Sequence, residues 1–191
     1  HQKVYFVIEF SKPFDKFEPI GENGFYYRIH FKTEEGEQIG VKVALSSTSP
    51  AGAELNFSTE VKDKDFDTVR KETRAKWQNE LRKIRIYGAT EEQNEIFYTG
   101  MYHMYVAPSL FSDVDGTYRG ADNEIHENPG YHTYTTFSLW DTYRAKLPLM
   151  TITHPELMDD ITNTMINICE EQGFLPIWHL WGWDNGCMVG S

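Results

Sequence analysis

Two segments of the sequence place tryptophans beside carboxylates, a combination suited to binding sugars. Trp140 directly precedes Asp141, and residues 178–183 hold three of the five tryptophans, followed by Asp184 and Asn185. An indole face packs on the apolar C–H face of a sugar ring, while a carboxylate accepts hydrogen bonds from neighbouring hydroxyls. Both segments are therefore candidates for a carbohydrate pocket.

Both segments also have a structural interpretation. Trp140 fits the core side of a helix, and Asp141 fits a first helical turn, where the helix dipole favours a carboxylate. The tryptophans of residues 178–183 equally fit rings that line a helix interface. Residue types alone leave both interpretations open.

A third segment, residues 111–120 (FSDVDGTYRG), combines two carboxylates, one arginine and two glycines. It could bind a metal or a polyol, although Gly116 does not stand at the spacing of an EF-hand calcium loop. The alternative is that the aspartates form Asx turns and that Arg119 pairs with one of them. Asp113 and Arg119 remain candidate substrate-binding residues.

Other kinds of chemistry lack a motif. The histidines show no His-x-His or His-x3-His pair, and there is no Cys-x-x-Cys, so no metal ligand is assigned. There is no nucleophile elbow and no glycine-rich phosphate loop. Cys169 and Cys187 cannot form a disulfide framework and are expected to be free thiols.

Composition excludes several partners. The 191 residues carry 29 acidic and 18 basic side chains, for a net charge of −11. Such a charge disfavours nucleic acid, and no apolar run is long enough to insert into a membrane. The chain opens directly into a strand-like run without Met or a signal segment, so we expect a piece of a longer polypeptide.

The first third of the chain reads as strands and the rest as helices. Period-two alternation in residues 25–31 predicts an antiparallel sheet with one face on a second sheet. We expect strands at 4–10, 25–31, 39–45 and 55–58, and helices at 65–86, 92–106, 137–146 and 154–172. Helix 92–106 is apolar nearly all round and is expected to be buried on most sides. The long connection 109–134 is of a length that is commonly functional.

Four ordered motifs resemble glycoside hydrolase family 92, the calcium-dependent exo-acting α-mannosidases. They are residues 97–103 (FYTGMYH), 107–120 (APSLFSDVDGTYRG), 134–144 (YTTFSLWDTYR) and 173–180 (GFLPIWHL). Upstream, residues 41–46 with Ala53 and Asn56, and Trp77 with Leu81, resemble the end of the family's β-sandwich and its linker helices. The resemblance covers nearly all of the chain.

The resemblance implies a multidomain α and β fold, in which an antiparallel β-sandwich portion (1–62) and a linker helix (63–90) precede part of an (α/α)6 barrel (91–191). The active site would lie between sandwich and barrel. Asp141 matches the family's sugar-hydroxyl-binding aspartate, and Trp140 its neighbour. The general acid and base are expected downstream of Ser191, so no catalytic residue is assigned here. Ca2+ is the implied cofactor, with ligands mostly outside this chain.

Two neighbouring positions depart from the family pattern. Asp184 stands where the family commonly has glutamate, and Trp183 replaces a polar residue. We hypothesise that this replacement reshapes the edge of the pocket and changes which mannoside is accepted.

The sequence thus predicts part of an exo-acting, inverting α-mannosidase of α-1,2 type. It would act on mannose-containing glycans in a secreted or periplasmic protein, and the isolated chain would be inactive. One alternative is a non-catalytic carbohydrate-binding or scaffold module. Another, an (α/α)6 hydrolase of glucosides, fits the architecture but not the four motifs.

Overall fold

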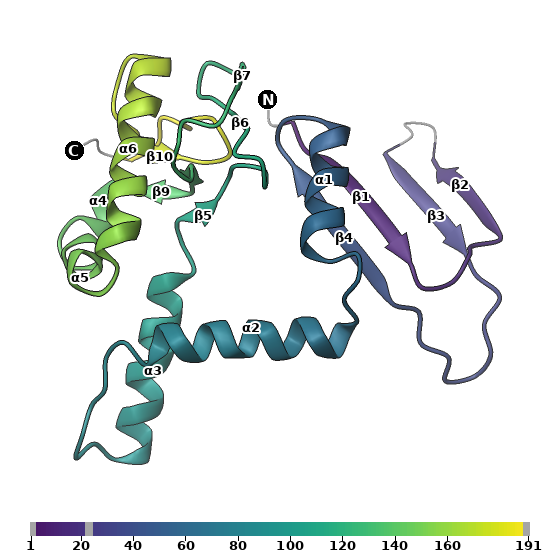
Figure 1. The fold of residues 1–191 in the computed structure, drawn as a ribbon, viewed down its shortest axis with the longest axis horizontal. Helices are drawn as coiled ribbons and strands as arrows, with labels where there is room; N and C mark the ends of the chain where they lie inside the picture. The colour runs from purple at the N-terminus through teal and green to yellow at the C-terminus, as the bar shows by residue number, and fades with distance from the viewer. Residues whose placement is uncertain (1–2, 22–24, 189–191) are drawn as a thin grey trace.

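A computed structural model describes residues 3–21 and 25–188 of the chain. Figure 1 shows two parts, a group of strands with one helix and a group of helices with short strands. The long helix α2 (Phe66–Leu81) runs between them and meets α3 (Glu91–Tyr105) at its far end. The change from strands to helices that the sequence predicts is therefore present.

The strand part contains two antiparallel pairs. Strand β1 (Tyr5–Phe10) pairs with β4 (Val41–Ser46), and β2 (Lys16–Ile20) pairs with β3 (Tyr26–His30). The predicted dry and wet faces of residues 25–31 are not seen, since Tyr26 and Tyr27 are both exposed. Among the described residues nothing covers this hairpin as a second sheet would.

Helix α1 (Pro50–Glu60) replaces the strand predicted at residues 55–58, so that prediction was wrong. Ser49 caps the helix by accepting a hydrogen bond from the backbone N–H of Gly52 at 2.9 Å, and Pro50 occupies the first turn. Ala53 and Phe57 are buried. The helix packs on β1 and β4 through this face.

The two helices α2 and α3 have strong caps and exposed flanks. Asp65 caps α2, which ends at Leu81, short of the predicted residue 86, and has no buried residue. Thr90 and Gln93 form a capping box at the start of α3. Met101 is the one buried residue of α3 and Ile96 is 66% exposed, so the prediction that this helix is buried on most sides was wrong.

The predicted connection 109–134 contains short strands rather than loop alone. Strand β5 (Ser109–Leu110) pairs with β8 (Tyr134–Thr135), and β6 (Tyr118–Arg119) pairs with β7 (Ile125–His126). The β5–β8 ladder joins the two ends of the connection and the β6–β7 ladder forms a hairpin within it, while β8 contacts α6.

The helix predicted at 137–146 is also wrong. The chain instead forms β9 (Phe137–Ser138), a single turn α4 (Leu139–Thr142) and the helix α5 (Lys146–Thr153). Pro148 lies in the first turn of α5, where its missing N–H would have no helical partner in any case.

The final helix α6 (Pro155–Gln172) confirms the helix predicted at 154–172. It ends at Gly173, whose φ of 92° is left-handed and suits glycine. The buried core of the helical part consists of Phe137, Met150, Ile161 and Ile168. The chain then continues into β10 (Trp178–His179).

Both cysteines are free thiols, as expected. None of the helices in the described part of the chain is long and apolar enough to cross a membrane. The complete sandwich and (α/α)6 barrel, and the domain boundaries after residues 62 and 90, stay predictions.

Candidate functional site

The pairing of β9 with β10 brings the two tryptophan–carboxylate segments together. Trp178 lies opposite Ser138, and His179 lies opposite Phe137. Because Trp140 and Asp141 follow β9 directly, they belong to the same structural unit as the tryptophan-rich segment. We call residues 135–141 and 177–186 together the β9–β10 site.

Asp141 is the exposed carboxylate of this site. It lies in the first turn of α4, and its Oδ2 accepts a hydrogen bond from the hydroxyl of Ser138. No described residue donates to its Oδ1. The neighbouring Trp140 is half-buried, and its buried indole N–H has no hydrogen-bond partner among the described residues. The free Oδ1 of Asp141 is therefore available to a ligand, whereas the indole N–H is buried.

Asp184 has a different environment, because it is buried and accepts hydrogen bonds from backbone groups. Its Oδ2 accepts from the N–H groups of Ile177 (2.6 Å) and Trp178 (3.1 Å), and its Oδ1 accepts from Gly186 (2.8 Å). The neighbouring Asn185 is exposed. Asp184 therefore holds the tryptophan-rich loop in shape, and its contact with substrate, like that of Asn185, stays a prediction.

Two residues of the site other than glycine have backbones in the left-handed region. Thr136 has a φ of 69° and Trp181 a φ of 55°. Such values are unfavourable for branched or bulky side chains and gather at functional sites. The N–H of Trp181 donates to the hydroxyl of Thr135 at 2.7 Å, which helps to hold this conformation.

His179 is almost fully buried in the site, and burial lowers its pKa to about 4 although Asp184 opposes the shift. The pKa of His179 in the folded protein lies below its ordinary value, so the folded protein disfavours the protonated ring. The contribution of neutral His179 to the free energy of unfolding is therefore complete above pH 6.5 and is lost as the pH falls towards 4. We expect a loss of about 3 kcal/mol in the free energy of unfolding over this range.

Urea denaturation at several pH values measures this loss. His179→Leu should flatten the dependence between pH 6.5 and 4, whereas His103→Gln, a change at an exposed histidine on α3, should leave it as in the wild type. The same acid-induced loss in wild type and His179→Leu would contradict the prediction.

Asp113 lies between the two parts of the molecule rather than at the β9–β10 site. It is 4% exposed, and its Oδ2 accepts from the hydroxyls of Ser46 (2.7 Å) and Thr48 (2.5 Å). Its Oδ1 accepts from the side-chain amide of Asn56 at 2.8 Å. We call Ser46, Thr48, Asn56 and Asp113 the Asp113 cluster. It joins β4 and α1 to the 111–120 loop.

Arg119 contributes to the same contact. Its Nε donates to the carbonyl of Ser47 at 2.8 Å, its Nη2 to that of Thr48 at 3.3 Å and its Nη1 to that of Asn123 at 2.8 Å. The expectation that Arg119 pairs with an aspartate of its loop was therefore wrong. For Arg119, as for Asp113, binding of substrate stays a prediction.

A cleft of about 540 Å³ opens between the strand part and the helical part. This volume is within the usual range of ligand pockets. Asp113 and Trp181 lie in its wall together with Thr135 and His132. Trp140, Asp141, Asp184 and Asn185 are not among its lining residues, so the cleft meets the β9–β10 site only through Thr135 and Trp181.

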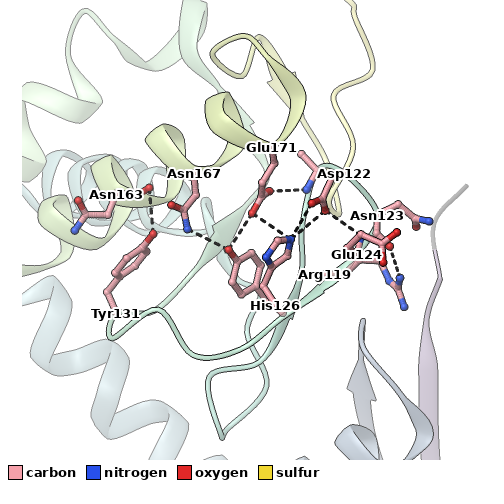
Figure 2. A network of polar contacts seen from close by, with 11 residues as sticks. Arg119, Asp122, Asn123, Glu124, His126, Tyr131, Asn163, Asn167 and Glu171 are labelled. Carbon is pink, nitrogen blue, oxygen red and sulfur yellow. Dashed lines mark hydrogen bonds and ion pairs between the residues drawn. The ribbon is translucent and has the colours of Figure 1, made fainter.

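The structure also gathers a polar cluster that sequence spacing missed. Asp122, His126 and Glu171 have ligating atoms within 4.8 Å of one another, and Figure 2 shows them converging from the β6–β7 turn and α6. Burial raises the pKa of Asp122, but hydrogen bonds from Glu124 and His126 outweigh it and hold the pKa below its usual value. Glu171 comes from a distant helix, so no local motif predicts the cluster.

This cluster does not fit calcium. Ca2+ takes six to eight oxygen ligands, whereas His126 offers a nitrogen. In residues 3–21 and 25–188 it is the single group of at least three histidine, cysteine or acidic side chains close enough to hold a metal.

Comparison with solved structures shows close likeness to mannosidases. The α-mannosidase BT3965 from Bacteroides thetaiotaomicron is 34% identical over 98% of this chain and 28% of its own, with a TM-score of 0.87. The inverting mannosidase BT2199 of the same organism is 31% identical over 98% of this chain and 27% of its own, with a TM-score of 0.86. The chain thus spans about a quarter of the length of these proteins.

No match was found among curated proteins. A family model described as the glycosyl hydrolase family 92 catalytic domain matches residues 52–191. The matched residues include the β9–β10 site, the 111–120 loop and most of α1. The four motifs are thus supported by an independent family match and by two solved mannosidases, and the chain belongs to glycosyl hydrolase family 92.

Proposed function

We propose that the protein is an exo-acting, inverting α-mannosidase of α-1,2 type. The main support is the likeness to BT3965, which has also been solved in complex with mannoimidazole, at 33% identity over 98% of this chain. The similar protein BT2199 is an inverting mannosidase. The β9–β10 site adds the residue types that sugar recognition needs, an indole beside an exposed carboxylate.

In this proposal the chain supplies substrate binding rather than proton transfer. Asp141 accepts hydrogen bonds from sugar hydroxyls, and Trp140 contributes an apolar face. Asp184 maintains the loop that carries Trp178 and Trp181. An inverting hydrolase also needs a general acid and a general base, with carboxyl groups about 6.5–9.5 Å apart to admit water. We propose that these lie outside residues 1–191.

Calcium dependence is part of the proposal, with ligands mostly outside this chain. Its support is the family resemblance. Removal of calcium with a chelator should abolish mannoside hydrolysis, and added Ca2+ should restore it.

A secreted or periplasmic location has the same support. Fractionation of the native cells would test it, since activity confined to the cytoplasm would contradict the proposal.

The activity is tested by NMR with mannobioses of each α linkage. We expect the purified protein to release the β-anomer of mannose first, and α-1,2-mannobiose to be cleaved fastest. Residues 1–191 alone should hydrolyse none of them. Release of the α-anomer, or a faster reaction with another linkage, would refute the stereochemistry or the linkage. Binding of mannan without any hydrolysis would favour the carbohydrate-binding module instead.

A further inference from the structure

We propose that Asp122, His126 and Glu171 bind one zinc ion or a similar first-row transition metal ion. The three residues come from two separate elements, the β6–β7 turn and α6 (Figure 2). This site is separate from the sugar-binding residues, and the inference does not depend on the proposed mannosidase activity.

The distances between the ligating atoms suit a small cation. His126 Nε2 lies 3.0 Å from Asp122 Oδ2 and 3.7 Å from Glu171 Oε1. Zinc binds nitrogen and oxygen ligands at about 2.0–2.2 Å, so tetrahedral ligand atoms stand about 3.3–3.6 Å apart. Shifts of a few tenths of an ångström would therefore admit the ion, with water at the fourth position.

The charges of the cluster call for a cation. The side chain of Glu171 is only 9% exposed, and that of Asp122 is 31% exposed. Among the described residues no lysine or arginine lies within 4 Å of either carboxylate, and His126 is their only basic neighbour. Glu171 has little solvent to offset its charge, and a second carboxylate beside it adds to the need for positive charge. A divalent ion supplies it and uses the imidazole as a neutral ligand.

Surrounding groups already orient the ligands. Glu171 Oε2 accepts from the N–H of Ala121 at 2.7 Å, and Oε1 accepts from the hydroxyl of Tyr118 at 2.9 Å. The ring of His126 stacks on Tyr118 at 5.2 Å. Such outer contacts are what fix metal ligands in place.

Gly120 leaves the space that the ligand atoms occupy. A Cβ at this position would lie 2.6 Å from Asp122 Oδ1 and 2.6 Å from His126 Nε2. Any other residue would therefore push both ligands away. The absence of a side chain at Gly120 thus lets the ligand atoms of Asp122 and His126 come together, and this observation does not depend on their charges.

The nitrogen ligand selects the class of ion. Calcium and magnesium prefer oxygen, whereas imidazole with carboxylates suits zinc and its neighbours. A bound ion would link the β6–β7 turn to α6. Since Arg119 lies in β6 and donates to the carbonyls of Ser47 and Thr48, this link would also steady the contact between the two parts of the molecule.

Zinc binding to the purified protein, stripped of metal and titrated calorimetrically with zinc sulfate, tests the proposal. The wild type should bind one more equivalent of zinc than His126→Gln and Asp122→Asn. Asp122 is exposed in its turn, so Asp122→Asn should fold even if His126→Gln does not. His103→Gln is the matched control and should bind as the wild type does. Tyr118→Phe should keep the equivalent but bind it about tenfold more weakly.

The zinc should also raise the unfolding temperature of the wild type and not that of Asp122→Asn. Equal zinc stoichiometry in the wild type and both ligand variants would overturn the proposal. Calcium bound in place of zinc and lost in Asp122→Asn would overturn the assignment of the ion.

Discussion

Asp113→Ala is expected to lower the free energy of unfolding by about 3–5 kcal/mol. The substitution removes three hydrogen bonds to a buried carboxylate and leaves the donors of Ser46, Thr48 and Asn56 without their acceptor. Bonds to charged groups contribute about 1.5–3 kcal/mol each, but the freed hydroxyls can turn to other partners, which limits the total. Urea denaturation followed by tryptophan fluorescence measures the loss.

Asp115→Ala is the matched control, since Asp115 lies in the same loop but is exposed and accepts only from Thr117. It should cost about 1 kcal/mol or less. Asp113→Asn keeps one oxygen acceptor, so its loss in the free energy of unfolding should lie between those of Asp113→Ala and Asp115→Ala. If Asp113→Ala were as stable as Asp115→Ala but raised KM for the mannoside, Asp113 would be a substrate ligand, as the sequence suggested, and not the link between the two parts.

Asp141→Ala should reduce kcat/KM for the preferred mannoside by about 10²- to 10⁴-fold. Two hydrogen bonds from sugar hydroxyls to a carboxylate would be lost, each contributing about 1.5–3 kcal/mol. Stability should change little, because Asp141 is exposed and its one described partner is the hydroxyl of Ser138. Initial rates with the cleaved mannobiose, together with an unfolding curve, separate the two effects.

Asp159→Ala, at an exposed aspartate on α6, controls for the loss of a negative charge and should leave kcat/KM unchanged. Asp141→Asn should recover part of the activity, since its amide oxygen still accepts one hydrogen bond. A kcat/KM for Asp141→Ala within about threefold of the wild type, less than the loss of one such bond, would remove Asp141 from the sugar site.

Local patterns in the sequence predicted α2, α3 and α6 because each carries its own periodicity and end signals. The start of α1 also carries an end signal, because Ser49 is a good N-cap residue and Pro50 suits a first turn. The apolar run at 55–58, however, also fits a strand. Short apolar runs do not distinguish a strand from a buried helix. No helix is predicted over residues 147–153, although Pro148 lies in the first turn of α5, where a proline is tolerated.

The candidate site could be predicted only in part. Trp140, Asp141 and the tryptophan-rich segment were found from residue types and motifs, because each is contiguous in the chain. The Asp113 cluster and the Asp122, His126 and Glu171 cluster each join segments far apart in sequence. No spacing rule reaches such contacts, because they depend on how distant segments of the chain pack together.

The left-handed backbones of Thr136 and Trp181 affect which substitutions selection for thermal stability would favour in this protein. Glycine would adopt either conformation more readily, so a search for heat resistance alone would tend to replace both residues. Such replacements would also remove the indole from the cleft wall. Glycine at these two positions would therefore raise thermal stability and at the same time remove a side chain that could contact a ligand.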